Sequence, residues 1–90
     1  MGRQRRPQPR LLAPKLRVIR DALEIGQAEM ARRLNYVPSA PDGAMISRYE
    51  RGEREPSLFV LLAYARVVGV AVDVLIDDQI TLGNFKKMIS

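Results

Sequence analysis

The sequence predicts an all-α fold of five short helices joined by turns. Two observations support this fold class, and a third excludes a membrane-spanning helix. Apolar residues recur at the helical spacing of three to four positions, as in Leu16, Ile19 and Leu23. Glycine, proline, serine and aspartate, the residues that typically start or stop helices, separate the apolar segments. The longest apolar run, 58–65, is too short to span a bilayer.

The first two helices are predicted from their starts and their apolar stripes. Pro14 suits the first turn of helix one, because its missing N–H has no helical partner there. Gly26 is expected to cap helix two, although it has no side chain to bond the exposed N–H groups. Met30 and Leu34 supply the buried stripe of helix two, and Asn35 ends it.

The third and fourth helices have clearer boundaries. Asp42 is expected to cap helix three, and Gly52 and Pro56 stop it. Helix four is predicted to begin at the cap Ser57 and to end before Gly69. Its expected core stripe is Leu58, Leu61, Leu62 and Ala65.

Residues 70–76 predict a short fifth helix with a weak start, because Ala71 stands where a capping serine is common. The β-branched residues that dominate 67–76 make a strand the alternative.

The composition restricts the functions that this chain can have. Ninety residues with 47% apolar content make one small folded domain. The absence of cysteine excludes disulfides and thiolate metal sites, and the absence of histidine removes the commonest general base and metal ligand. We therefore expect no enzyme and no cofactor. Since no apolar segment near Met1 resembles a secretory signal, we expect an intracellular protein without membrane association.

The net charge of +5 is concentrated near the N-terminus. Residues 1–17 carry +6 and the remainder −1. Prolines at positions 7, 9 and 14 keep this basic arm out of a regular helix. An exposed basic arm suits a polyanion such as DNA, with Arg5 and Arg6 as candidate contacts. The alternative is a tail that only improves solubility.

Segments 16–20, 27–34, 44–56 and 56–66 together resemble the phage-repressor (Cro/repressor, XRE) type of helix-turn-helix DNA-binding domain. The resemblance covers roughly residues 14–78, leaving an arm (1–13) and a C-terminal tail (79–90). It implies a five-helix repressor-like domain that binds double-stranded DNA as a transcriptional regulator. It also implies a homodimer in the bacterial cytoplasm or on a bacterial or phage nucleoid.

The turn between helices two and three is longer than the resemblance implies. Eleven residues separate Leu34 from Ile46. Pro38 and Pro41 make the inserted segment 37–41 a stiffened loop and not a longer helix. We expect Tyr36 to anchor the start of this loop in the core, and the loop to lie near the DNA backbone.

The resemblance assigns Gln27 to a DNA phosphate, with a solvent-facing side chain as the alternative. It makes helix three the recognition helix, with Gly43, Ala44 and Met45 as its first exposed positions. None of these three offers a bidentate hydrogen-bond pattern to a base, although Ala44 or Met45 can pack on a thymine methyl.

Ser47 and Arg48 follow on the same helix. Arg48 can read guanine through two hydrogen bonds, and its alternative role is a phosphate contact. Arg51 and Arg54 are candidate phosphate contacts after helix three. Because Glu53 and Glu55 are interleaved with them, a solvated mixed surface is the alternative. By the resemblance, Arg20 and Glu50 form a structural ion pair.

Several apolar residues stand at positions that are often polar in the family. The functional interpretation is a dimer or protein-partner interface, and the alternative is a C-terminal tail that folds back over helix four. A protein-interaction module, for example an antitoxin-like adaptor with secondary DNA binding, is therefore the second functional hypothesis. The residues are Phe59, Val60, Ala63 and Val74, with Ile80, Leu82, Phe85, Met88 and Ile89 in the tail.

Overall fold

The computed structural model describes residues 8–89, which form six α-helices and contain no strand. The all-α prediction is confirmed, and the strand alternative for 67–76 is wrong. Five of the helices form the predicted domain, and a sixth lies in the predicted C-terminal tail, 79–90. The helices are α1 Leu12–Leu23, α2 Gln27–Arg33, α3 Gly43–Glu50, α4 Leu58–Val68, α5 Asp73–Ile76 and α6 Leu82–Ile89.

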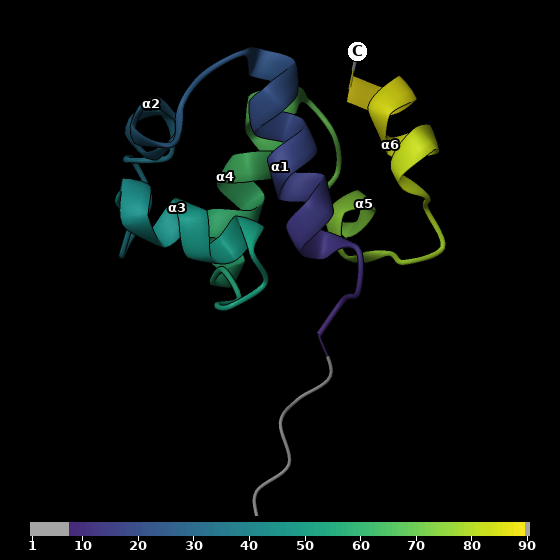
Figure 1. Cartoon of the computed structure of the whole chain (residues 1–90), viewed down its shortest axis with the longest axis horizontal. Coiled ribbons are helices and arrows are strands. Elements are labelled where there is room, and N and C mark those ends of the chain that lie inside the picture. Colours follow the sequence, from purple (N-terminus) through teal and green to yellow (C-terminus); the bar gives the residue numbers. More distant parts are fainter. Residues whose placement is uncertain (1–7, 90) are drawn as a thin grey trace, which may run out of the picture.

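Helix α1 lies at the centre of the fold (Figure 1). Helices α2 and α3 lie on one side of it, α5 and α6 on the other, and α4 crosses behind it. Side chains from all six helices meet in one core. Its fully buried members include Leu16, Ile19, Met30, Leu34, Ile46, Tyr64, Leu75 and Phe85.

The predicted helix boundaries at three polar or glycine residues are confirmed. The Asp42 carboxylate accepts a hydrogen bond from the Met45 N–H at 2.9 Å, and the Ser57 hydroxyl accepts one from the Val60 N–H at 3.2 Å. Gly69 ends α4 with a φ of 74°, a left-handed conformation that favours glycine. These local signals fix where α3 and α4 begin and where α4 ends.

Helix α4 buries two residues of the predicted core stripe, Leu61 and Ala65, but its buried face also includes residues that were predicted elsewhere. Leu58 is 80% exposed and does not join the core. Val60 and Ala63, expected on the interface patch, are buried instead. Since α4 is apolar almost all round, the spacing of its apolar residues does not identify the inward face.

Lys15 joins α1 to α5 and α6. Its side chain is fully buried, and its Nζ donates hydrogen bonds to the carbonyls of Val74 at 2.9 Å and Asp77 at 2.8 Å. The ammonium also lies 5.8 Å from the centre of the Phe85 ring, within cation–π range. Burial lowers the pKa of Lys15, while the nearby charges of Asp78 and Asp77 raise it.

The C-terminal segment folds back on the domain, as one of the two alternatives for it proposed. It packs against α1 and not over α4 (Figure 1). The Thr81 hydroxyl accepts a hydrogen bond from the Asn84 N–H at 3.2 Å at the start of α6, and Phe85 is fully buried. Within this segment Met88 stays half-exposed.

The loop between α2 and α3 is held at both ends. Tyr36 is 59% exposed, so the prediction that it anchors the loop is wrong. Its neighbour Val37 packs against the core instead, and Pro41 is buried at the other end. Ser39 has a φ of 54°, a left-handed turn between these two anchors.

Candidate nucleic-acid interface

Arg20 and Glu50, assigned to an ion pair from the resemblance, do form one. The Arg20 Nε lies 2.7 Å from Glu50 Oε2, and Nη2 lies 3.0 Å from Oε1. Arg20 also donates from Nη1 to the Ile25 carbonyl at 2.9 Å. The hydrogen bonding to Glu50 raises the pKa of Arg20. Both side chains are largely buried, so this contact fixes the end of α3 against α1 and the α1–α2 turn.

Gln27, the first residue of α2, is tied to the same carboxylate. Its Nε2 donates to Glu50 Oε1 at 3.3 Å. The amide is therefore held at the junction of α1, α2 and α3 and does not point freely into solvent. Glu50 thus joins the start of α2 and the end of α3 to α1.

Gly43, the first residue of α3, lies close to the backbone of α2. A Cβ at this position would stand 3.4 Å from both the Cα and the N of Ala28. The side of Gly43 that lacks a side chain therefore faces α2. Glycine at this position therefore allows α3 to pack closely against the backbone of α2.

The outward face of α3 is carried by Ala44 and Arg48, which are one helical turn apart and both exposed. Met45 is half-buried and packs against the core, and Ser47 accepts a hydrogen bond from Arg51. Among residues 8–89, no partner lies within hydrogen-bond or ion-pair distance of the Arg48 side chain, although its charge contributes to the lowered pKa of Glu53. Among the described residues on this face, Arg48 is thus the one charged side chain whose five N–H donors are all available to a ligand.

Arg51 is engaged by a neighbouring acid. Its guanidinium donates to Glu53 at 2.8 and 3.1 Å, which raises the pKa of Arg51 and lowers that of Glu53. Arg32 and Arg33 share Glu29 in the same way, at 2.8 and 3.4 Å. The positive charge of this region is therefore partly compensated, as the mixed-surface alternative proposed.

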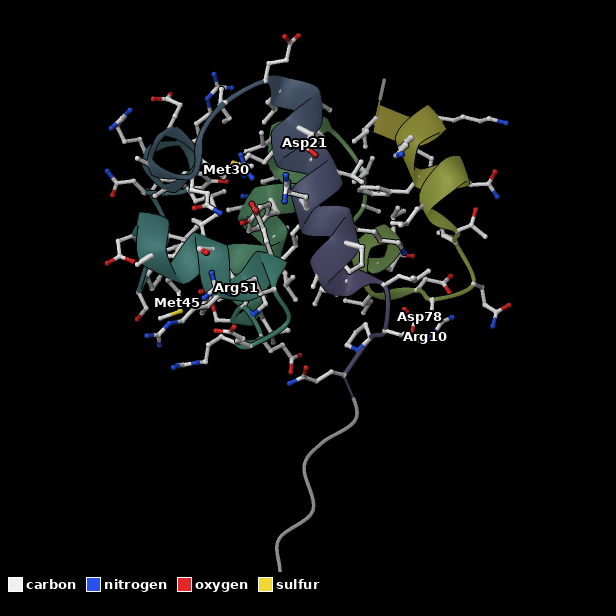
Figure 2. All side chains as sticks on the ribbon, viewed as in Figure 1. Arg10, Asp21, Met30, Met45, Arg51 and Asp78 are labelled. Atoms are coloured by element: carbon white, nitrogen blue, oxygen red, sulfur yellow. The ribbon has the colours of Figure 1, made fainter. Side chains whose placement is uncertain are left out.

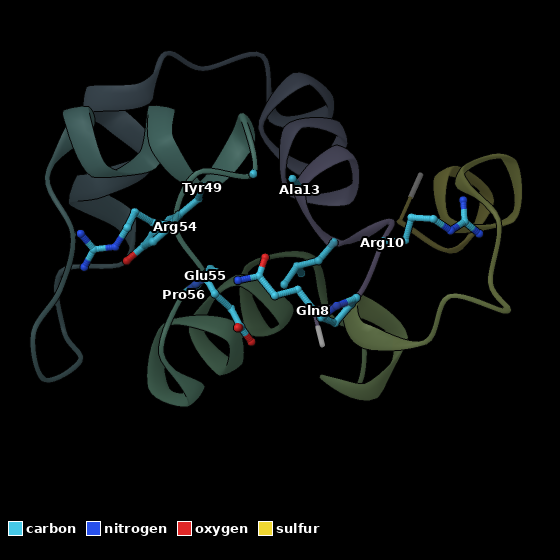
Figure 3. A pocket seen from close by; sticks show the side chains of 10 residues that line it. Gln8, Arg10, Ala13, Tyr49, Arg54, Glu55 and Pro56 are labelled. Atoms are coloured by element: carbon cyan, nitrogen blue, oxygen red, sulfur yellow. The ribbon is translucent and has the colours of Figure 1, made fainter. Parts of the chain in front are cut away.

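Two hollows flank the segment that follows α3. One, of about 470 Å³, lies between the segment around Gln8–Arg10 and the residues Tyr49, Gly52 and Arg54–Pro56. The other, of about 420 Å³, lies between the 39–42 loop, Met45 and Arg54. Figure 3 shows Gln8 beside Glu55 and Pro56, with the Arg10 side chain pointing the other way.

The base of the N-terminal arm therefore lies beside the end of α3. The candidate contacts Arg5 and Arg6 lie outside the residues that the structure describes. Figure 2 shows Met45 and Arg51 on the α3 side of the molecule, and Arg10 and Asp78 together at the start of α1.

Lys15 and Asp78 were not identified from the sequence as functional or structural residues. A lysine in a basic segment carries no sign of burial, and Asp78 is one of two adjacent acids in a loop. Within residues 8–89, acidic side chains form no group of three that could hold a metal ion. None of the helices in this range has the length and apolar character needed to cross a membrane.

Comparison with known proteins gives two kinds of match. The helix-turn-helix family model matches residues 42–75, which begin at the cap of α3, directly after the inserted loop. The crystal structure of the P22 c2 repressor protein in complex with a synthetic operator is similar, with a TM-score of 0.65 and 28% identity. That match covers 77% of this chain and 97% of the other.

The solution structure of the P22 c2 repressor DNA-binding domain is also similar. Its TM-score is 0.66 at 25% identity, and the match covers 89% of this chain and 99% of that domain. A search of curated proteins found no match.

Proposed function

We propose that this chain is a helix-turn-helix protein of the phage-repressor (Cro/repressor, XRE) type, which binds double-stranded DNA sequence-specifically as a transcriptional regulator. The P22 c2 repressor that it resembles was crystallised with an operator. We propose a cytoplasmic or nucleoid location. The proposal includes no enzymatic activity and no cofactor.

The observation that carries the proposal is the network around Glu50. Arg20 and Gln27 both donate to this carboxylate, so α1, α2 and α3 are held in one arrangement. A recognition helix must be held in register with its phosphate contacts to read bases in the major groove. The hydrogen bonds to Glu50 are of the kind that would hold α3 in this register.

We assign the contacts by exposure and chemistry. Ala44 and Arg48 face outward and are proposed to contact base edges, Ala44 at a thymine methyl and Arg48 at guanine. The remaining positions would contact the backbone or shape the helix around these two. The proposed phosphate contacts are Gln27, Arg51, Arg5 and Arg6. Gly43, Met45 and Ser47 belong to α3 and are proposed to hold it in place beside the DNA.

A homodimer is the proposed binding form, because two-fold operators present half-sites about 34 Å apart. Exposed apolar side chains on α4 and α5 support an interface there: Leu58 is 80%, Phe59 58% and Ile76 46% exposed. The same residues, with Val74, support the second hypothesis of a protein-partner surface. Val60 is excluded from either interface by its burial.

The proposed function is tested by selecting duplexes from a random-sequence pool and measuring their affinity against a scrambled control. We expect enrichment of a two-fold sequence, and an affinity at least about 10³ times that for the scrambled duplex. Equal affinity for both duplexes would exclude sequence-specific binding. Binding to neither, with a protein partner captured through Phe59, would favour the second hypothesis.

A further inference from the structure

Two consecutive backbone N–H groups at the base of the arm are bound by one carboxylate from the far end of the chain. The Arg10 N–H donates to Asp78 Oδ2 at 2.7 Å, and the Leu11 N–H donates to Oδ1 at 2.9 Å. Figure 2 shows Arg10 and Asp78 side by side. Each oxygen of the carboxylate therefore has its own donor, which fixes both the position and the direction of the chain there.

Asp78 acts where α1 lacks a cap of its own. Leu11 precedes α1 and offers no side-chain oxygen to the first turn. An acidic group at a helix N-terminus is also favoured by the helix dipole. The hydrogen bonds from Leu11 and then Arg10 lower the pKa of Asp78, so the carboxylate is charged at neutral pH.

The loop that carries Asp78 is itself held by α1. Lys15 donates to the Asp77 carbonyl at 2.8 Å, and the Asp77 carboxylate accepts from the Gln79 N–H at 2.9 Å within the loop. The start of α1 and the α5–α6 loop therefore fix each other in both directions. Because the Lys15 side chain is buried, it cannot easily change rotamer and release the loop.

This link determines where the basic arm begins. Gln8 and Pro9, immediately before the bound residues, line the hollow next to Tyr49 and Arg54 at the end of α3. The preceding residues include Arg3, Arg5 and Arg6. An arm held at its base loses less conformational entropy on binding than one that begins from a loose helix end.

We propose that Asp78 is a positioning residue for DNA binding: it holds the base of the basic arm beside the recognition helix, so that the arm's arginines reach the same DNA. This inference rests on the proposed function. A role of Asp78 as a helix cap alone would affect stability and leave the contribution of the arm unchanged.

The test is a double-mutant cycle in the full chain. One change is Asp78→Ala, and the other replaces Arg3, Arg5 and Arg6 together by alanine. Asp73→Ala is the control, because it removes the same charge from an exposed side chain of α5 that takes no part in the link between α1 and the α5–α6 loop. Affinity for a fluorescein-labelled random-sequence duplex is measured by anisotropy, and folding by circular dichroism.

We expect Asp78→Ala to weaken binding roughly three- to tenfold, the factor that corresponds to the entropy cost of ordering about one more side chain on binding. This loss should occur although the change adds +1 to the net charge. In the arm-alanine background Asp78→Ala should have no effect or slightly strengthen binding. Asp73→Ala in the parent chain should likewise have no effect or slightly strengthen binding. The amide hydrogens of Arg10 and Leu11 should also exchange faster in Asp78→Ala.

The inference is overturned if Asp78→Ala and Asp73→Ala have equal effects on affinity, or if Asp78→Ala weakens the parent and the arm-alanine chain alike. It is also overturned if the arm-alanine change leaves affinity unaltered. A parent chain that binds no duplex even at low salt would instead refute the proposed function. If Asp78→Ala unfolds, Asp78→Asn keeps one acceptor oxygen and should give an intermediate loss that again depends on the arm.

Discussion

Arg20 on α1 and Glu50 at the end of α3 are thirty residues apart in sequence and are joined by two hydrogen bonds, of 2.7 and 3.0 Å. The side chains are only 13% and 4% exposed. Gln27 completes the network from the first residue of α2. The pair therefore positions α3 relative to the rest of the domain.

We expect Arg20→Ala to lower the free energy of unfolding by about 3–5 kcal/mol, because Glu50 is left as a buried charge without its partner. Arg17→Ala is the control on the same helix. Its ion pair with Asp21 is more than half exposed on both sides, so its loss should cost less than about 1 kcal/mol. Urea unfolding followed by circular dichroism measures both, and equal losses would contradict the structural role of the pair.

Lys15→Met is expected to destabilise the fold by roughly 1–3 kcal/mol, because the carbonyls of Val74 and Asp77 lose their donor. Lys15→Ala should cost more, since it also opens a cavity beside Phe85. Lys86→Ala, an exposed lysine on α6, should change stability by less than about 0.5 kcal/mol. Thermal and urea unfolding rank the three variants by stability. If Lys15→Ala were as stable as the parent, Lys15 would not hold α1, α5 and α6 together as described.

Arg48→Ala should reduce discrimination between a selected duplex and a scrambled one by about 1–3 kcal/mol. Gln27→Ala should weaken binding to both duplexes to the same extent, as expected for a phosphate contact. Affinities at two salt concentrations distinguish the two roles. Equal weakening by Arg48→Ala on both duplexes would place Arg48 on the backbone.

The stability that Asp78 provides should depend on pH in a defined direction. Its pKa is lowered in the folded state, so its contribution is fully present above the unfolded value, near 3.9, and is lost as pH falls through the folded value. The difference in unfolding temperature between the parent and Asp78→Asn should therefore be constant from about pH 5 to 7 and shrink below about pH 4. A difference that grows at low pH would contradict this assignment.

The sequence predicted the features that depend on local signals. Asp42, Ser57 and Gly69 each act on backbone groups within a few residues, so their roles can be recognised from sequence alone. The pairing of Arg20 with Glu50 came from the family resemblance, because nothing in the spacing of the two residues indicates that they meet.

The features that the sequence did not predict depend on tertiary contacts. Leu58 and Val60 are both apolar, and only the packing of α4 decides that Val60 is buried and Leu58 exposed. Lys15 is buried because α5 ends and α6 returns beside it. For α6 a signal was present: Leu82, Phe85 and Ile89 follow helical spacing after the capping hydroxyl of Thr81.

The central claim is that the face carrying Gln27, Ala44 and Arg48 contacts DNA. Titration of isotopically labelled protein with a selected duplex, followed through backbone amide chemical shifts, tests this claim most directly. We predict the largest shifts at the start of α2 and on the outward face of α3, and small shifts on the exposed side of α6 near Asn84 and Met88. Shifts concentrated on α4–α6, with α2 and α3 unchanged, would contradict the account.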